Sequence, residues 1–330
     1  MKKNTFIGLD RDPAKVAAAR AYLREKGLYG SVTAARWDGS QLPYVDSLVK
    51  MIVLTENAGQ ISENEMMRVL APLGVIVDAR EREIEVSRKP WPVALDEWSH
   101  FLYDASNNAV SRDTVVAPPQ GLRWTCGPEY ARSHEHFASM SAMVSVGGRV
   151  FYIIDEGPIS SVYLPPQWKL VARDTFSGVL LWQRPITSWE SHLRGFRSGP
   201  PEIGRRLVAT DEQVYVALGY GEPVAVLDAA TGKQLATCTD TGGARELLLT
   251  GGVLYVLADD LTADQHEERS TAAGSAFRPS RIWSALMRSQ ARSCGVASDR
   301  SQGAGSPGPR PPWSSRMEWC SHSTAQQATI

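Results

Sequence analysis

Short apolar runs alternate with amphipathic segments over the first eighty residues of the chain. The apolar runs have the length and continuous hydrophobicity of strands buried on both faces, and they span residues 6–9, 32–37, 47–54 and 75–77. A helix is expected to begin at Pro13, which follows a capping aspartate, and to end near Gly27. A second helix is expected over residues 62–70, with Pro72 ending it. This order predicts an α/β domain with a doubly wound parallel sheet over residues 1–80.

In the middle of the chain the pattern changes to strands bounded by glycine and proline, and part of it occurs twice. The segments 172–181 and 226–235 share the pattern Ala/Val-x-Asp-x-x-Ser/Thr-Gly-x-x-Leu. The acid and the hydroxyl can bond the backbone of a tight turn, and glycine can adopt a positive φ. The repeat predicts β-propeller hairpins within an all-β region over residues 96–264, with Trp182 packing between neighbouring sheets. Ala236 replaces that tryptophan in the second copy, which predicts weaker packing there.

Two segments follow neither pattern. Residues 81–95 mix charge and proline and are expected to form a linker. Residues 265–330 contain eight Arg, thirteen Ser, no Lys and no Tyr, a composition poorly suited to strands. We expect this tail to be disordered and translated out of frame, and a basic tail that binds nucleic acid is the alternative.

Three segments of the α/β region, 7–10, 38–44 and 67–74, resemble successive landmarks of class I S-adenosylmethionine-dependent methyltransferases. The resemblance implies a Rossmann-like domain in which Asp10 holds the ribose of the cofactor and Asp38 meets its adenine amino group. Carboxylates at the carboxyl edge of parallel strands suit such roles. The alternative is that both aspartates are solvated turn residues.

One part of the methyltransferase pattern is missing from this sequence. The family's first strand and its glycine-rich turn, which wrap the methionine part of S-adenosylmethionine, should precede Phe6. We therefore expect a partial or decayed domain, for which S-adenosylmethionine would be the cofactor only in an intact homologue. No catalytic residue is assigned in it.

The repeat in the middle of the chain resembles the PQQ-like, or quinoprotein-like, repeat of β-propellers over roughly residues 140–260. Quinone-dependent dehydrogenases of this family bind PQQ and calcium with residues at the axial funnel, and no such set is found here, so PQQ is not expected. Trp182 is expected to pack blades rather than to stack on a quinone. Asp174 and Asp228 are expected to accept turn hydrogen bonds rather than to ligate a metal. Together with the methyltransferase-like front, the chain is similar to large bacterial fusion proteins with PQQ-like repeats.

A polar and aromatic cluster lies between the linker and the repeats. His134 and His136 alternate as on one strand face, and His100 and Asp104 precede them in the sequence. A metal or substrate pocket is one interpretation. No further ligand stands at a recognisable spacing, which favours the other interpretation, in which these residues are hydrogen-bonded connectors that close the first blade. No metal site is expected.

Charge and hydropathy narrow the range of partners. The formal net charge of -1 and the pI near 6.6 give no reason to expect nucleic acid or an anionic membrane surface. No stretch reaches the roughly 18 to 20 apolar residues that a transmembrane helix needs. The N-terminus reaches an acidic residue after a short apolar run, so no signal peptide is predicted, and the default location is cytoplasmic.

The predicted function is that of a binding scaffold. In this prediction a fragment of a PQQ-like β-propeller presents a surface to a protein or a small-molecule ligand, and the methyltransferase-like domain is degenerate. Two alternatives stay open. The first is an S-adenosylmethionine-dependent methyltransferase whose missing strand is supplied by another chain or by an upstream segment, and the second is a quinone-dependent oxidoreductase.

Overall fold

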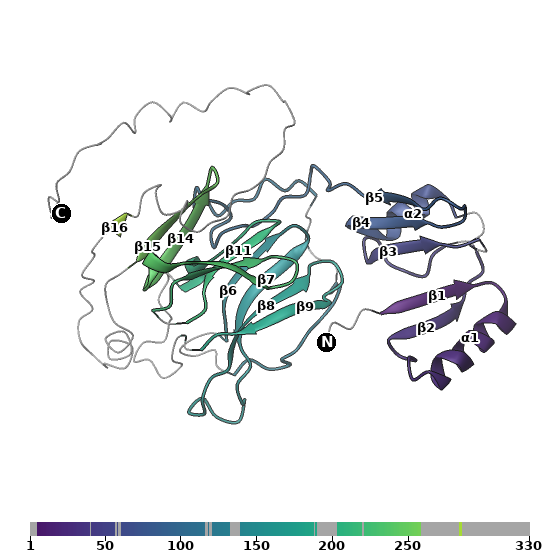
Figure 1. Ribbon diagram of the computed structural model, residues 1–330, viewed down its shortest axis with the longest axis horizontal. Coiled ribbons are helices and arrows are strands. Elements are labelled where there is room, and N and C mark those ends of the chain that lie inside the picture. Colours follow the sequence, from purple (N-terminus) through teal and green to yellow (C-terminus); the bar gives the residue numbers. More distant parts are fainter. Residues whose placement is uncertain are drawn as a thin grey trace, which may run out of the picture. The chain divides into compact units, whose positions relative to one another are not determined.

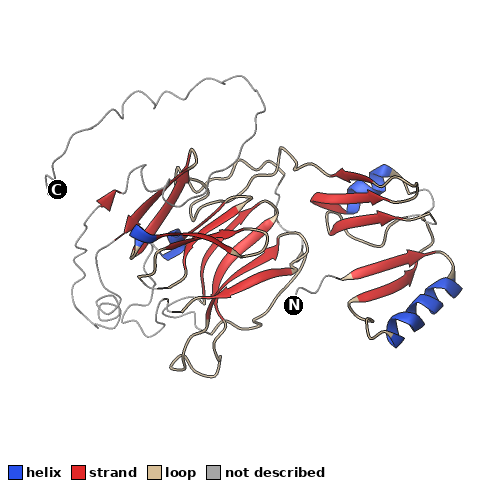
Figure 2. Cartoon of the chain, viewed as in Figure 1, coloured by secondary structure: helices blue, strands red, loops and turns tan. Residues whose placement is uncertain are grey.

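Strands predominate over helices in the computed structural model of the chain, and they form several separate sheets (Figure 2). The structure describes residues 5–39, 41–56, 58, 61–115, 118, 121–132, 139–187, 189, 203–219, 221–258 and 284–285. The predicted tail after residue 264 therefore lies outside the described residues, apart from the two that form β16 (Ser284–Ala285). No described helix is long and apolar enough to cross a membrane.

Strands and helices alternate in the N-terminal region, as predicted. The elements are β1 (Phe6–Asp10), α1 (Pro13–Glu25), β2 (Val32–Arg36), β3 (Val49–Leu54), α2 (Glu63–Val69), β4 (Leu70–Asp78) and β5 (Glu85–Arg88). β1 pairs in parallel with β2, and β3 pairs in parallel with β4, so each helix connects two parallel strands (Figure 1). The strands form a two-stranded sheet and a three-stranded sheet rather than the single sheet that was expected. Among the described strands, β1 pairs only with β2, and β3 pairs only with β4, so no described strand joins the two sheets.

The helix boundaries follow local chemistry. The Asp12 side chain accepts a hydrogen bond from the backbone N–H of Ala14 at 2.8 Å, and Pro13 opens α1, which confirms the predicted start. The second helix is shorter than expected. It ends at Val69, because Leu70 already has extended backbone angles and begins β4. A proline two residues later is compatible with that early end, since it disfavours helical geometry in the residue before it.

The predicted linker over residues 81–95 contains an unexpected strand. β5 lies within it and pairs antiparallel with β4, from Val75 opposite Arg88 to Asp78 opposite Glu85. All four residues of β5 are exposed, so the hydrophobic alternation that announces a half-buried strand is weak. The domain boundaries at residues 80 and 95 stay predictions.

The rest of the described chain forms antiparallel sheets. The first sheet contains β6 (Met140–Val146), β7 (Arg149–Asp155), β8 (Trp168–Asp174) and β9 (Leu180–Pro185), and the second contains β10 (Leu207–Ala209), β11 (Gln213–Ala217), β12 (Val224–Asp228) and β13 (Gln234–Cys238). The third contains β14 (Ala244–Thr250), β15 (Val253–Ala258) and β16, and the short 3-10 helices η1 (Ile203–Arg206) and η2 (Thr239–Thr241) precede β10 and β14. In the first and second sheets each strand pairs with the next along the chain (Figure 1). Apolar side chains from both of these sheets share one buried core.

The repeated sequence pattern forms the same hairpin turn in both sheets. Asp174 Oδ1 accepts from the backbone N–H of Ser177 at 2.9 Å and from its hydroxyl at 2.9 Å. Asp228 Oδ1 accepts from the N–H of Thr231 at 2.7 Å and from its hydroxyl at 2.6 Å. The glycine that follows has a φ of 70° in both copies, which favours glycine at that place. The prediction that these aspartates are turn acceptors is confirmed.

A tryptophan side chain from an earlier part of the chain packs against each of these turns. Trp182, on β9, donates its indole N–H to the carbonyl of Ala229 at 3.0 Å, and its ring lies so close to Gly232 that a Cβ there would come within 2.6 Å of it. Trp124 docks in the same way on the hairpin of the first sheet, donating to the carbonyl of Thr175 at 2.8 Å. The predicted packing role of Trp182 is therefore confirmed. On β13, the corresponding residue is Ala236, which cannot make this contact.

Candidate functional site

The two predicted cofactor residues lie at one edge of the β1–β2 sheet. Asp10 is the last residue of β1 and stands opposite Arg36, the last residue of β2, so Asp38 follows only two positions beyond that pair. The backbone N–H of Trp37 donates to the carbonyl of Asp10 at 3.0 Å, which continues the pairing toward Asp38. Asp10 is half-buried and Asp38 is exposed. The structure thus brings both carboxylates to the carboxyl edge of parallel strands, where α/β sheets bind ligands.

The basic side chain of Arg11, which follows Asp10, lies against the loop that contains Asp38 and Gly39. The guanidinium of Arg11 lies directly against Gly39, where a Cβ would come within 2.1 Å of Nε. Arg11 also lies 5.6 Å from the ring centroid of Trp37 and donates weakly to the carbonyl of Gly39, at 3.4 Å. A ligand that reached both Asp10 and Asp38 would therefore contact Arg11.

These residues fit only part of S-adenosylmethionine. The carboxylates of Asp10 and Asp38 are acceptors of the kind that ribose hydroxyls and an adenine amino group require. The methionine part needs backbone N–H groups from a glycine-rich turn after a further strand, and no such strand and turn occur among the described residues beside β1. Among the described residues, the geometry places two carboxylate acceptors at one sheet edge, without the backbone donors that the methionine part would need.

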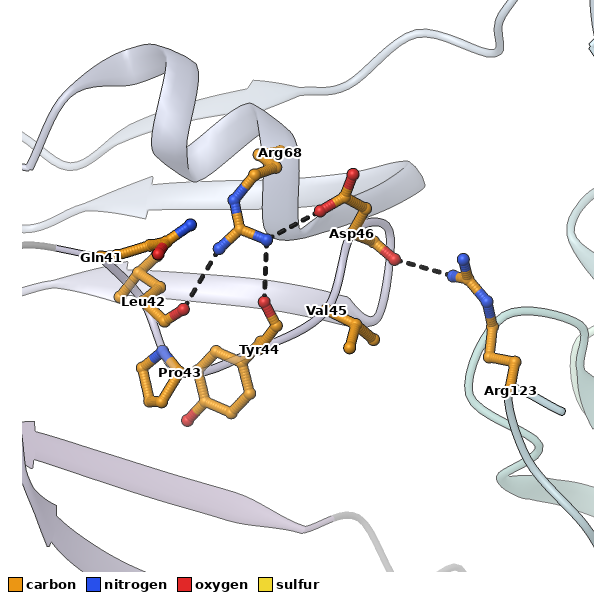
Figure 3. Close-up of a pocket in the computed structure, with 8 residues that line it drawn as sticks. All are labelled: Gln41, Leu42, Pro43, Tyr44, Val45, Asp46, Arg68 and Arg123. Carbon is orange, nitrogen blue, oxygen red and sulfur yellow. Dashed lines mark hydrogen bonds and ion pairs between the residues drawn. The ribbon is translucent and has the colours of Figure 1, made fainter. Parts of the chain in front are cut away.

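A pocket of about 670 Å³ is lined by a different set of residues: Gln41, Leu42, Pro43, Tyr44, Val45, Asp46, Arg68 and Arg123 (Figure 3). Arg68 projects from α2 into the loop that forms most of this lining. Its guanidinium donates to the carbonyls of Leu42 at 3.1 Å and Tyr44 at 2.9 Å, and to the Asp46 carboxylate at 2.7 Å. Arg123 donates to the carbonyl of Asp46 at 2.7 Å.

Most of the polar capacity of this pocket is already used within the chain. Glu65, on the neighbouring turn of α2, binds Arg68 through both carboxylate oxygens, at 2.8 and 2.7 Å, and accepts from the backbone N–H of Leu42 at 2.6 Å. The hydrogen bonds from Arg68 hold the pKa of Glu65 below its usual value. Arg68 and Glu65 therefore hold the loop against the helix. The polar groups of this pocket stabilise the fold and leave few atoms to bind a ligand.

His100 is buried among the antiparallel sheets and is fully engaged in hydrogen bonds. Its Nε2 accepts from the backbone N–H of Leu249 on β14 at 3.0 Å, and its Nδ1 lies 2.8 Å from the hydroxyl oxygen of Ser99. Because Nε2 is an acceptor, we assign the proton to Nδ1, which donates to Ser99. Burial lowers the pKa of His100, and the nearby Asp104 carboxylate opposes that shift. The serine is not activated by this histidine, since the imidazole lone pair is used by Leu249.

The segment around His100 touches all three antiparallel sheets. Trp98 exchanges two backbone hydrogen bonds of 2.8 Å with Ser145 on β6, and the carbonyl of Ser99 accepts from the N–H of Ala209 on β10 at 3.1 Å. His100 adds the bond to β14. The side chain thus acts as a connector, as the favoured interpretation predicted.

The other members of the predicted polar cluster do not join His100 in a metal site within the described chain. Asp104 accepts from the N–H and the hydroxyl of Ser106 in a local turn, at 2.8 and 2.5 Å. His134 and His136 lie outside the described residues. No group of three His, Cys, Asp or Glu side chains that could hold a metal ion occurs among the residues that the structure describes.

Sequence inspection missed a buried ion pair in the first sheet. Arg132 Nη1 lies 3.0 Å from Asp155 Oδ2, and their side chains are 1% and 0% exposed. Arg132 Nη2 also donates to the carbonyls of Ser161 at 3.1 Å and Val162 at 3.2 Å, and to that of Leu164. The two partners stand 23 positions apart without a local motif, so no sequence signal could have paired them.

The loop that this ion pair holds connects β7 to β8 and carries exposed apolar side chains. Asp155 Oδ1 accepts from the backbone N–H groups of Gly157 at 2.8 Å and Gln167 at 2.6 Å, which ties both ends of the loop to one carboxylate. Ile159 is 59% exposed and Tyr163 is 81% exposed. Residues 156–167 are therefore an ordered loop that presents apolar surface to solvent.

Comparison with known proteins gives partial structural similarity. No protein-family model matches the sequence, and no curated protein matches it. Among solved structures, the chain is similar to the YcgJ protein from Bacillus subtilis, with 25% identity, 23% of this chain and 34% of that chain covered, and a TM-score of 0.21. It is similar to the [4+2]-cyclase SpnF, with 27% identity, 23% and 29% covered, and a TM-score of 0.20. A europium-containing methanol dehydrogenase shows 14% identity, 49% and 27% covered, and a TM-score of 0.33.

The chain spans about a third or less of the length of each of these three proteins. Similarities with TM-scores of this size do not by themselves assign a fold or an activity to this chain.

Proposed function

We propose that this chain is a protein-binding scaffold. In this proposal the three antiparallel sheets are successive blades of an incomplete PQQ-like β-propeller, and the α/β elements are a degenerate, Rossmann-like methyltransferase domain. The repeated Asp-to-Gly turns and the docked tryptophans support the blade interpretation. The alternation of parallel strands and helices supports the other half.

The observation that carries the scaffold proposal is the ordered apolar loop over residues 156–167. The buried pair of Arg132 and Asp155 fixes this loop, so little conformational entropy would be lost when a partner binds it. Ile159 and Tyr163 project into solvent, and an aromatic side chain on a fixed support is a common anchor at protein interfaces. Small molecules prefer concave sites, so an exposed loop favours a protein as the partner.

Several described polar side chains that could act in catalysis or metal binding are engaged in structural hydrogen bonds instead. This supports a scaffold rather than an enzyme. His100 bonds a strand, Asp174 and Asp228 hold turns, and Glu65 with Arg68 clamps a loop. The same bonds leave the quinone-dependent alternative without a described residue in its favour, since Trp182 is committed to packing between sheets.

One observation favours the methyltransferase alternative. Among the described strands, β1 and β3 each have one partner, and each runs parallel to it. A strand inserted between them would pair with both and unite the five strands in one sheet. Asp10 would then lie beside the added strand's carboxyl end, as a cofactor site of that class requires.

The scaffold proposal is tested by affinity capture with a loop variant. The chain is immobilised as wild type, as Ile159→Ser with Tyr163→Ser, and as the control Leu122→Ser, which changes an equally exposed apolar residue elsewhere. A partner from an extract of cells that produce the protein should bind the wild type and the control. Its retention should fall at least about tenfold on the loop variant, because interface anchors contribute about 2 kcal/mol each.

Equal retention on all three chains, or capture of no partner at all, would contradict the proposal. Circular dichroism of the three proteins checks that the exposed substitutions leave the fold intact. The rival enzyme functions are addressed by calorimetry with S-adenosylmethionine and, separately, with PQQ plus calcium, for which no low-micromolar binding is expected.

A further inference from the structure

Residues 98–100 hold the three antiparallel sheets by two different kinds of bond. The first and second sheets are held by backbone hydrogen bonds, from Trp98 to Ser145 and from Ala209 to Ser99. The third sheet is held through a side chain, because Leu249 on β14 donates to Nε2 of His100. Backbone bonds do not titrate near neutral pH, whereas an imidazole does. Of these hydrogen bonds, only the bond from Leu249 to His100, which joins the third sheet to residues 98–100, can respond to pH.

Protonation of His100 is incompatible with the observed geometry. In the imidazolium both ring nitrogens carry a proton, so Nε2–H would face the N–H of Leu249 as a second donor. The side chain is buried, with 6% of its surface exposed, and a charge there is poorly solvated. Both effects act against the closed contact with β14.

The charged groups around this contact were considered element by element. β6 and β10 carry no ionisable residue, and Asp104, on the same segment as His100, is the carboxylate that favours its charged form. On β14, Glu246 is paired with Arg205 of η1 at 2.7 Å, and each of these elements carries one further arginine, Arg245 and Arg206. Burial and the Asp104 carboxylate are therefore the two influences on the charge of His100, and burial is the larger.

The junction of the second and third sheets is also the one without a tryptophan lock. Trp182 joins the first sheet to the hairpin of the second, but Ala236 stands at the equivalent place on β13. The second and third sheets instead share a buried apolar core, and the bond from His100 adds a polar contact between β14 and residues 98–100.

We propose that His100 is an acid-sensitive latch, which holds β14 against residues 98–100 while the imidazole is neutral and releases it when the imidazole is protonated. This inference rests on the hydrogen-bond geometry and is independent of the scaffold proposal.

The direction of the pH effect follows from linkage. The pKa of His100 is lower in the closed structure than in the open one, so the open form binds more protons. Closure is then unaffected above the ordinary histidine pKa of about 6.5, and below it the opening constant rises up to about tenfold per pH unit. The rise ends when pH falls below the pKa of the closed form.

Hydrogen exchange followed by mass spectrometry tests the latch on the full chain at about pH 7.5 and about pH 5. The protection of a peptide covering β14 is divided by that of a peptide covering β6, each corrected for intrinsic exchange, so that general effects of pH cancel. In the wild type this ratio should fall at the lower pH, by up to about thirtyfold. In His100→Gln it should stay constant, because the amide oxygen can accept from Leu249 and does not titrate.

A second variant keeps the test decisive if His100→Gln does not fold. Asp104→Asn removes the carboxylate that favours protonation of His100 in the closed structure. The pKa of the closed form should then be lower still, and over a series of pH values the fall in the ratio should continue to a lower pH than in the wild type. An unchanged ratio in the wild type, an equal fall in His100→Gln, or a fall in Asp104→Asn that ends at the wild-type pH or above would each overturn the proposal.

Discussion

The α/β elements and the antiparallel sheets of this chain differ in how completely they bury their apolar side chains. Phe151, Leu170 and Val214, on three strands of the first and second sheets, are fully buried. Met51 and Val53, on β3, are 53% and 54% exposed although β3 is a parallel strand. Parallel strands are normally covered on both faces. The apolar residues of these strands are therefore typical of a larger and better covered sheet than the two small sheets that they form.

The contrast has a structural cause. In the antiparallel region the first sheet packs against the second and the second against the third, and Trp182 contacts the turn of the second sheet. In the α/β region each helix covers one face of its own strand pair, and the β1 and β3 edges have no described partner. A repeated architecture is stable with a few units because each unit needs only its neighbour. A doubly wound sheet depends on its central strands and on both helical layers.

The largest expected effect of this difference is on association. We predict that the chain self-associates through the open β3 edge, because unpaired apolar strands pair with other chains. Size-exclusion chromatography with light scattering should show a concentration-dependent mass, and Met51→Lys with Val53→Lys should shift the chain toward the monomer. The control Val93→Lys adds charge at a fully exposed residue outside the sheets and should change little. A monodisperse wild-type monomer would contradict this prediction.

A second expected effect concerns the lock between the first and second sheets. Trp182→Ala should lower the free energy of unfolding by about 3 to 5 kcal/mol, since it empties a buried aromatic site and leaves the carbonyl of Ala229 without its indole donor. Denaturant unfolding followed by circular dichroism measures the loss. Trp182→Phe keeps most of the packing and should lose less, and equal losses in both variants would show that the hydrogen bond dominates instead.

A smaller effect is expected from the loop clamp of the α/β region. Arg68→Met should lower the midpoint of denaturant unfolding, because it leaves Glu65 and two carbonyls without their charged donor. Arg80→Met removes an ion pair with Asp78 on a more exposed side chain and should leave the midpoint almost unchanged. Similar losses in the two variants would mean that the hydrogen bonds of Arg68 contribute no more to stability than an exposed ion pair does.

Sequence reasoning succeeded where the signal is local. The helix start at Pro13 depends on the residue before it, and the turns at Asp174 and Asp228 depend on residues three and four positions later. The match between Trp182 and its docking turn was predictable only because the repeat places the same residues at the same spacing. The helix start and the turns are decided by local chemistry, whereas the packing role of Trp182 was predicted from the repeat.

The rest could not be found from the sequence because distant residues decide it. The pair of Arg132 and Asp155 and the bond from His100 to Leu249 join positions that no pattern connects. β5 was missed because an exposed strand lacks the hydrophobic alternation that marks a strand. For the candidate site, the sequence indicated Asp10 and Asp38 but not the guanidinium of Arg11 against Gly39, which depends on how the two loops meet.

The smallest expected effect is the binding of S-adenosylmethionine to the open edge of the β1–β2 sheet. Asp10 and Asp38 offer acceptors for the nucleoside, but the described strands supply no backbone cradle for the methionine part, and Arg11 adds a positive charge near the place where the cationic cofactor would lie. We therefore predict a dissociation constant above about 100 μM, which corresponds to a binding free energy weaker than about 5.5 kcal/mol. Isothermal titration calorimetry with the wild type, Asp10→Ala and Arg11→Ala measures it. Removing Arg11 should strengthen binding modestly, and removing Asp10 should abolish what remains. Low-micromolar binding that Asp10→Ala eliminates would instead show that the α/β elements hold a working cofactor site, and the comparison between the two regions would then have to be drawn again with an active α/β domain.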